Sequence, residues 1–230
     1  MRRLLTFPVV LVAMYVAQTA ATRADSCAAD QLGGLVCGEG KRAARVFADT
    51  TSPSKKYAFA WRTPDGLPSG KETPEGVENV LLRLSDGAVI AKLGGEYWST
   101  GEMRANRYDL RAAWSPDSRA VIEVANSRWN SDSFAYYLLD GAAVTKLDLR
   151  ALVEPVMKAK LPARKREFNA FRVREELPVT LDTRGQLRFT AMVYVPKSET
   201  SLDYEIRVDI SAKNGKPSAR IVSMRRVKSD

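Results

Sequence analysis

From residue 43 onward the chain alternates between short apolar segments and turn dipeptides, and this pattern restricts the fold more than any other feature. The dipeptides are Asp86-Gly87, Asp140-Gly141 and Asn214-Gly215. Asp-Gly and Asn-Gly between apolar segments favour β-hairpins, because a type I′ turn needs positive φ at both central residues. Many of the flanking segments alternate polar and apolar residues, as half-buried antiparallel strands do. The sequence therefore predicts an all-β, mainly antiparallel fold.

The hairpins recur in groups. Ser52 and Ser115, each followed by proline, open the first two groups and lie 63 residues apart, and a related segment starting at Leu181 follows about 66 residues later. Each group has room for four short strands, so we expect three units that resemble propeller blades, with a β-sandwich as the alternative. The expected division is a disulfide-closed segment at 25–43 and a β-rich domain at 44–230 with units at about 44–107, 108–175 and 176–230.

The segment Ala-Trp-Ser-Pro-Asp-Ser-Arg at 113–119 resembles the Trp-Ser-Pro-Asp-Gly-Lys/Arg signature of TolB-type periplasmic β-propeller repeats, and Ser-Pro-Ser-Lys-Lys at 52–56 is a weaker copy. Proline fixes φ in such a turn, and the aspartate bonds the backbone that follows it. The resemblance, which covers about 25 residues, implies a propeller that binds proteins or gates another domain's active site. Ser54 and Ser118 depart from it, because the family has Asp and Gly there. Three units are also fewer than the four to eight blades that close a ring, which leaves an open stack or a ring completed by a dimer.

One helix is expected near 149–160. Its apolar positions follow helical spacing behind Asp148, which is a favourable N-cap residue. Pro155 lies inside this segment and predicts a kink or a break. We interpret the apolar stripe as core contact, with a partner-binding helix as the alternative. The stripe consists of Leu149, Leu152, Val153, Val156 and Met157.

Residues 1–24 have the order of a cleaved secretory signal. Arg2 and Arg3 precede a run of about 14 apolar residues, and small residues follow it. This run is shorter than the roughly 20 residues that span a bilayer. Cleavage is expected before Asp25, or less favourably before Thr22. Removal of this segment lowers the net charge from +9 to +6. The mature chain is therefore expected to be periplasmic or secreted.

Cys27 and Cys37 are the two cysteines of the chain and lie ten residues apart. In an oxidising compartment this spacing predicts one local disulfide, since a metal or redox pair would need different spacing or more ligands.

The chain contains no histidine. Serine or cysteine triads and most catalytic zinc sites need an imidazole, so these classes of enzyme are excluded. The glycines also lack the spacing of nucleotide-binding loops. We therefore expect no catalytic residue, no metal and no cofactor. The enzymatic alternative is a carbohydrate-acting hydrolase with a carboxylate pair, for which Asp117, Glu123 and Asp132 are the candidates.

A basic segment at 158–174 is the first candidate binding surface. It suits an anionic partner, such as lipid headgroups in a peripheral membrane contact or an acidic polymer, while nucleic acid is disfavoured by the compartment. The alternative is a solvated linker whose Phe168 and Phe171 pack on the neighbouring sheet. The basic residues proposed for binding are Lys158, Lys160, Arg164, Lys165 and Arg166, and the segment also holds Arg172 and Arg174.

A set of loops is the second candidate. Three loops join strands at corresponding places in the three units, so they are expected at one end of the units. These loops are 62–76, 126–133 and 196–202. Arg128 and Trp129 lie in the second loop, where Trp129 could stack on a sugar or anchor a partner, or could fold back on the sheet. Trp61, Trp98 and Trp114 are expected in the core. The sequence thus predicts an exported, non-catalytic protein that binds a protein or an acidic polymer.

Overall fold

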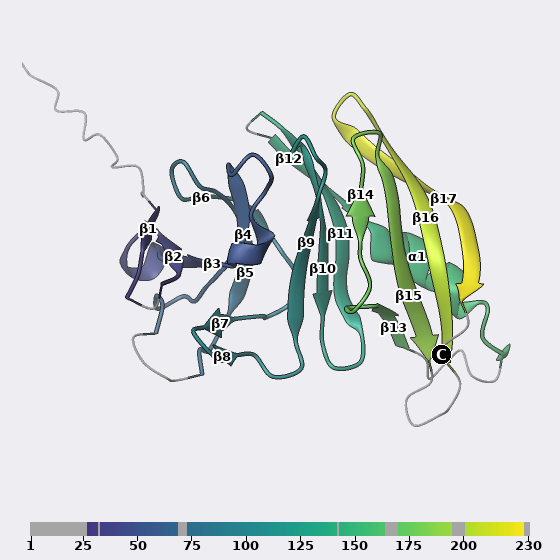
Figure 1. Ribbon diagram of the computed structural model, residues 1–230, viewed down its shortest axis with the longest axis horizontal. Helices are drawn as coiled ribbons and strands as arrows, with labels where there is room; N and C mark the ends of the chain where they lie inside the picture. The colour runs from purple at the N-terminus through teal and green to yellow at the C-terminus, as the bar shows by residue number, and fades with distance from the viewer. Residues whose placement is uncertain are drawn as a thin grey trace, which may run out of the picture.

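The computed structural model describes residues 27–31, 33–68, 73–141, 143–163, 170–194 and 201–227. These residues form antiparallel β-sheets and one α-helix, which confirms the predicted mainly antiparallel β class (Figure 1). The predicted secretory signal lies outside the described residues.

The first sheet is built from the N-terminal part of the chain and has six strands in chain order. Cys27 and Cys37 face each other across β1 and β2 and form the predicted disulfide. Two 3-10 turns, at Gly40–Arg42 and Ala48–Thr50, flank β3. The strands are β1 (Cys27–Ala29), β2 (Leu35–Cys37), β3 (Ala44–Val46), β4 (Tyr57–Arg62), β5 (Glu78–Arg83) and β6 (Ala88–Lys92).

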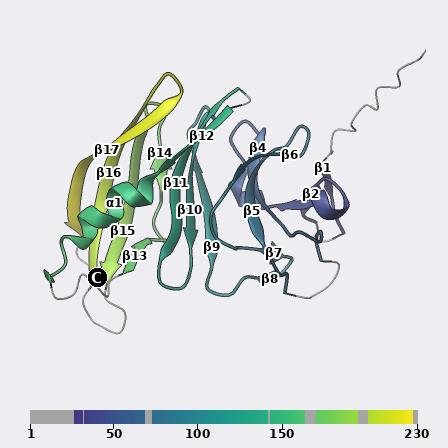
Figure 2. The same ribbon diagram turned by 180° about the vertical axis from the view of Figure 1, so that it is seen from behind.

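The second sheet is a four-stranded meander in the middle of the molecule (Figures 1 and 2). A short hairpin of β7 (Ser99–Thr100) and β8 (Met103–Arg104) lies between the first two sheets in the chain. The strands of the second sheet are β9 (Asp109–Trp114), β10 (Ala120–Asn126), β11 (Ser131–Asp140) and β12 (Ala143–Asp148).

The third sheet contains the C-terminal strands. Its members are β13 (Ala170–Val173), β14 (Thr180–Leu181), β15 (Gln186–Tyr194), β16 (Ser201–Lys213) and β17 (Lys216–Val227). β13 had been assigned to the second predicted unit, but it pairs with β15 and so belongs to the third sheet. At the predicted turn between β16 and β17, Asn214 and Gly215 have φ of 53° and 72°, as a two-residue type I′ turn requires.

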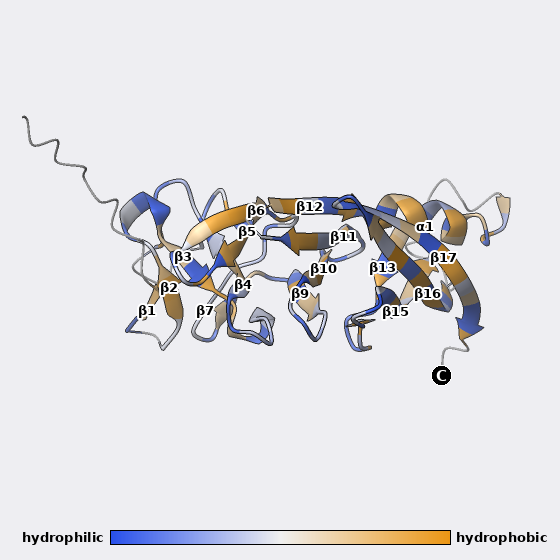
Figure 3. Cartoon of the chain, turned by 90° about the horizontal axis from the view of Figure 1, so that it is seen from above, coloured by the Kyte–Doolittle hydropathy of each residue, from blue (hydrophilic) through white to orange (hydrophobic). Residues whose placement is uncertain are grey.

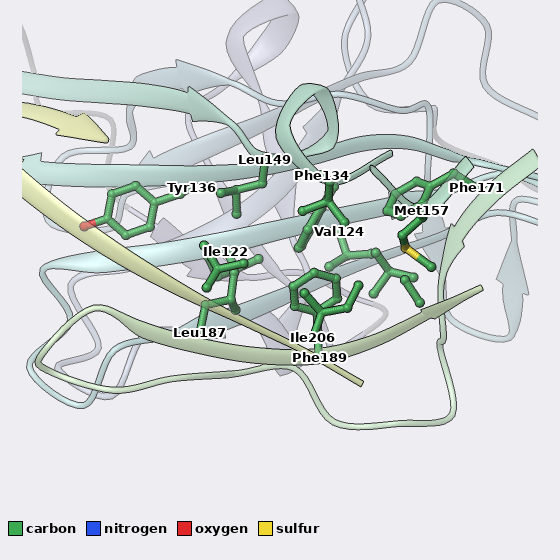
Figure 4. Close-up of a cluster of buried hydrophobic side chains, with 14 of the residues drawn as sticks. Ile122, Val124, Phe134, Tyr136, Leu149, Met157, Phe171, Leu187, Phe189 and Ile206 are labelled. Carbon is green, nitrogen blue, oxygen red and sulfur yellow. The ribbon is translucent and has the colours of Figure 1, made fainter. Parts of the chain in front are cut away.

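The three sheets are stacked face to face in a row, and a separate core fills each junction (Figure 3). One core lies between the first two sheets. It contains Phe59, Trp61 and Leu81 of the first sheet and Val121 and Tyr137 of the second. The opposite face of the second sheet packs on the third sheet and the helix; Figure 4 shows this core, in which the rings of Phe134 and Phe189 lie 4.7 Å apart. Within the described residues the row is open, because no sheet closes the stack into a ring.

The predicted helix is α1 (Leu149–Lys158), and Asp148 caps it by accepting a 3.0 Å hydrogen bond from the Ala151 amide. It continues through Pro155 without the predicted break. Leu149, Val153 and Met157 are fully buried in the core with the third sheet, whereas Val156 is 41% exposed. No helix in the described part of the chain is both long and apolar enough to cross a membrane.

The turns that lead into β4, β10 and β15 use the same hydrogen bonds. In each turn, a side-chain oxygen at the first position accepts a hydrogen bond from a backbone amide at the start of the strand. These bonds join Ser52 to Tyr57 (3.1 Å), Ser115 to Ala120 (3.0 Å) and Asp182 to Gln186 (2.8 Å). Each turn also contains a left-handed residue, and these residues are Lys55, Ser118 and Gly185, with φ of 57°, 60° and 79°. A Cβ at position 185 would lie 2.1 Å from the Ile210 carbonyl oxygen, so this position needs glycine.

Candidate functional site

A groove of about 1370 Å³ is lined by described residues from several parts of the chain. Its lining includes residues of the β7–β8 hairpin, the start of β9 and the loop after β10. Figure 1 labels these strands. Four stretches of chain line the groove, namely residues 73–77, 96–109, 128–129 and 172–175. The groove therefore draws on all three sheets or their connections, although no two of these stretches are neighbours in sequence.

Trp129 is the most exposed large aromatic residue of the groove lining, with 46% of its surface accessible. The Arg128 guanidinium lies 4.4 Å from the centre of the Trp129 ring, within the range of a cation–π contact. The ring of Tyr194 on β15 is 6.4 Å from the same indole, and its hydroxyl donates a 2.6 Å hydrogen bond to the Trp129 carbonyl oxygen. The exposed indole is thus carried by a backbone that the third sheet holds in place.

Local hydrogen bonds fix the loop that carries Trp129. The pairing of β10 with β11 shifts register at Asn126, where the strands give way to a tight connection. The Ser127 amide donates a 2.8 Å bond to the Asn130 carbonyl, and the Ser127 hydroxyl donates a 2.9 Å bond to Asp132. This loop is therefore a pre-formed turn, so its aromatic side chain needs little ordering on binding.

Buried polar contacts join this end of the second sheet to β13. Ser131 Oγ donates to Asn126 Oδ1 (2.6 Å) and accepts from the Val173 amide (2.8 Å), while Asn126 Nδ2 donates to the Val173 carbonyl (3.1 Å). Arg111 donates to the carbonyl oxygens of Arg174 and Glu175 at 3.1 and 2.9 Å. These bonds satisfy polar groups that the sheet junction would otherwise bury unpaired, and they set the position of the 172–175 wall of the groove.

The charges around the groove are balanced. Arg172 and Glu175 pair with each other on one wall. Burial raises the pKa of the Asp109 carboxyl above its usual value, against the effect of Arg111, whose Nε lies 3.3 Å away. The lining as a whole contains Arg104, Arg107, Arg128 and Arg172, together with Glu96, Glu102, Asp109 and Glu175. The groove therefore does not select for a ligand of one sign.

Two of the predicted loops meet at the groove. Residues from loop 62–76 and from loop 126–133 both line it, as expected for loops at one end of neighbouring sheets. Arg128 and Trp129 are the predicted binding residues that the structure brings together here. Most of the third loop, namely residues 196–200, lies outside the described residues.

The described residues of the predicted basic segment have different surroundings. Lys158 pairs with Glu154 at 2.5 Å, and Arg174 pairs with Glu176 at 2.6 Å, whereas Lys160 is an exposed residue that follows the helix. Neither Lys158 nor Lys160 is among the described residues that line the groove. Phe171 is fully buried in the core, as the linker alternative expected. The described residues do not include Arg164, Lys165, Arg166 or Phe168.

The candidate carboxylates have three different environments. Asp117 accepts bonds from the Ser115 hydroxyl (2.7 Å) and the Arg119 amide (3.2 Å), which is a turn role. Glu123 is fully buried, and Asp132 is bonded to Ser127. None of the three lines the groove. In the described part of the chain, no three His, Cys, Asp or Glu residues gather as metal ligands would.

Both oxygens of Glu123 are engaged by protein groups. Oε1 accepts a 2.5 Å bond from the Gly94 amide, and Oε2 is 2.7 Å from the Tyr137 hydroxyl, which also lies 3.3 Å from the Lys92 carbonyl. Burial raises the pKa of the Glu123 carboxyl. This contact joins β10 and β11 to the segment after β6, so it holds the first two sheets together.

Sequence reasoning missed the 96–109 wall of the groove. Tyr108 there is 40% exposed, and Trp98, which is 8% exposed, has the predicted buried position but also lines the groove. An aromatic residue in a polar stretch was the signal that singled out Trp129, and the same signal is present at Tyr108. Trp61 is fully buried as predicted, and Trp114 is partly buried, with its Nε1 donating a 2.7 Å bond to the Thr50 carbonyl.

No protein-family model matches this sequence, and no curated protein matches it.

Proposed function

We propose that this is an exported, non-catalytic binding protein whose groove holds a polypeptide segment of a partner protein. The observation that carries the proposal is Trp129, a 46% exposed indole on a hydrogen-bonded turn at the groove. Tryptophan, tyrosine and arginine are the residues that most often dominate binding energy at protein interfaces. Arg128 and Tyr108 supply the other two types within the same lining.

The balance of charge favours a polypeptide over an acidic polymer as the occupant of the groove. A polyanion would be repelled by Glu96 and Glu102 as strongly as it is attracted by Arg104 and Arg107. A polypeptide carries both signs along with apolar side chains, so it can match aromatic, acidic and basic groups in one recess.

The sequence and the disulfide support export. Residues 1–24 have the order of a secretory signal, and the Cys27–Cys37 disulfide suits an oxidising compartment. The absence of histidine supports a non-catalytic role, since imidazole-based mechanisms are unavailable.

We also propose that the three sheets are copies of one unit related to a propeller blade. The shared bonds of the turns before β4, β10 and β15 support this. Ser118 supports it as well, because its φ of 60° is the conformation that a glycine of the TolB-type signature would adopt at this position.

The test is site-specific photo-crosslinking in the compartment to which the protein is exported. A photo-reactive amino acid is placed at position 108 and, separately, at position 129, with exposed position 56 as the control. We expect one partner protein to be cross-linked from both groove positions and not from position 56. In addition, Trp129→Ala should reduce the yield from position 108 at least tenfold, because truncating an aromatic hot spot costs about 2 kcal/mol or more.

The proposal is wrong if the groove positions capture no protein that position 56 does not also capture. An unchanged yield from position 108 in Trp129→Ala would contradict the role of the indole. Thermal unfolding of each variant, followed by circular dichroism, separates loss of binding from loss of fold.

A further inference from the structure

The solvent-facing side of the third sheet contains a pair of like charges in direct register. Arg188 on β15 stands opposite Arg207 on β16, and both residues are exposed. Like charges directly opposite each other on neighbouring strands destabilise a sheet. The sheet thus has an arrangement on this face that folding alone does not favour.

Two further arginines surround this pair. Arg220 and Arg225 on β17 lie in the registers that flank Arg207, and their side chains are 75% and 78% exposed. Asp209 pairs with Arg220 at 3.0 Å. Glu205 pairs with Arg225 at 2.5 Å and reaches Arg207 only at 3.8 Å. The described ion pairs of these four arginines involve two carboxylates, those of Glu205 and Asp209, so the face has an excess of positive charge.

The hydroxyl side chains beside these arginines are suited to oxyanions. The outward-facing register positions on the same three strands include four hydroxyl residues, namely Thr190, Ser211, Ser218 and Ser223. The Ser211 and Ser218 hydroxyls lie 3.2 Å apart. Hydroxyl and guanidinium groups are both donors to phosphate, sulfate and carboxylate oxygens. With strands about 4.8 Å apart, the arginines are spaced at roughly 5 to 10 Å, which suits charges repeated along an extended chain.

We propose that this arginine face, defined by Arg188, Arg207, Arg220 and Arg225, binds a soluble linear polymer with repeated oxyanion groups. Such a polymer places several negative charges on one flat surface at once and relieves the repulsion between Arg188 and Arg207. A membrane surface is a poorer fit, because Ser211, Ser218 and Ser223 on this face carry hydroxyl groups. Val222, which is 49% exposed between Arg220 and Arg225, offers little apolar surface to a bilayer by itself.

The arginine face is independent of the groove. None of its four arginines lines the groove, whose own charges are balanced. The face belongs to the last sheet of the row, on the side turned away from the second sheet. The inference therefore holds or fails apart from the proposed function, and one chain could bind a polypeptide and a polyanion together.

The experiment measures binding of the full mature protein to fluorescently labelled heparin and to inorganic polyphosphate by anisotropy at several salt concentrations. The test variant is Arg188→Gln/Arg207→Gln. The control is Lys41→Gln/Lys56→Gln, which removes the same charge from exposed residues in the first-sheet part of the chain. We expect the test variant to lose at least tenfold in affinity for one or both polymers, and the control to change less than twofold. The slope of log K against log salt should become less steep by about one to two, since fewer counterions are released.

A second variant, Arg220→Gln/Arg225→Gln, should reproduce the loss, and melting temperatures from circular dichroism check that each variant is folded. Trp129→Ala should leave polymer binding unchanged. Equal losses in test and control variants would mean that net charge alone drives binding, and would overturn the proposal. Binding to anionic phosphatidylglycerol vesicles but to neither polymer would overturn it as well.

Discussion

The backbone amide of Ser54 donates a 2.9 Å hydrogen bond to the hydroxyl oxygen of Ser118, 64 residues further along the chain. Both residues lie in turns that have the same internal bonds, one leading into β4 and the other into β10. The two turns thus contact each other directly. Together with the bond from Trp114 to the Thr50 carbonyl, this contact joins the first two sheets at the end where β10 begins, away from the groove.

Replacing Ser118 by alanine should lower the free energy of unfolding by about 1 kcal/mol, because the Ser54 amide loses its acceptor. Lys55→Gly is the matched comparison, since Lys55 has the equivalent left-handed conformation and is exposed. It should be neutral or stabilising, because glycine adopts positive φ at little cost. Urea denaturation measures both, and an unchanged midpoint for Ser118→Ala would show that the contact between the turns does not stabilise the protein.

Replacing Glu123 by glutamine should change how stability depends on pH. Burial raises the pKa of Glu123, so the folded state holds the proton more tightly than the unfolded state. The stabilisation from this group is therefore present below the unfolded pKa near 4.5 and is lost as pH rises through the folded pKa. A glutamine imitates the protonated acid, because its oxygen can accept from Gly94 while its amide donates to Tyr137.

The expected result is that the wild type loses stability relative to Glu123→Gln between pH 4.5 and the folded pKa, by at most about 1.4 kcal/mol per pH unit. Urea denaturation of both proteins from pH 4 to pH 8 measures this difference. Because the two proteins share all other titratable groups, the pH dependence of those groups cancels in the difference. A stability difference that is constant over this range would contradict a raised pKa for Glu123.

Replacing Cys27 and Cys37 by serine should lower the free energy of unfolding by up to about 3 kcal/mol, the loop-closure value for a bridge spanning this separation. Denaturation of the double variant measures the loss. Alkylation of protein from the oxidising compartment should detect two additional thiols only after reduction. If both cysteines react without reductant, the disulfide is not formed there.

The mature N-terminus is expected at Asp25, or less favourably at Thr22, because small residues at the −3 and −1 positions direct signal cleavage. Intact-mass measurement of the exported protein distinguishes the two sites. Recovery of the chain with Met1 in a membrane fraction would contradict cleavage.

Local patterns predicted the strands, hairpins and helix because those signals lie within a few residues of the elements that they specify. Asn214 and Gly215 form the expected turn, and Asp148 caps the expected helix. Pairing between segments that are far apart in the chain was harder to predict from the sequence. β13 pairs with β15 across an intervening segment, and the Val173 backbone of β13 is also bonded to Asn126 and Ser131 in another sheet.

In the groove, too, one residue could be predicted from the local sequence and another could not. Trp129 could be singled out because an aromatic residue in a polar loop is unusual, whereas the role of Arg172 could not. Arg172 belongs to a basic segment that sequence alone treats as one surface, yet it pairs with Glu175 and lines the groove, whereas Lys158 and Lys160 do not line it. Such placement depends on how the sheets stack, which is set by contacts far apart in the chain.

Each of the three sheets is made only of strands that are consecutive in the chain. If the protein is exported as we propose, the first sheet would therefore have all its strands on the far side of the membrane while the third sheet is still being translocated. Folding could then proceed sheet by sheet as the polypeptide emerges, since short separations between paired strands favour rapid formation. The apolar faces that the next sheet covers, with Trp61 on one and Phe134 on another, would be exposed to solvent until that sheet forms, and a chaperone at the site of folding would have to shield them.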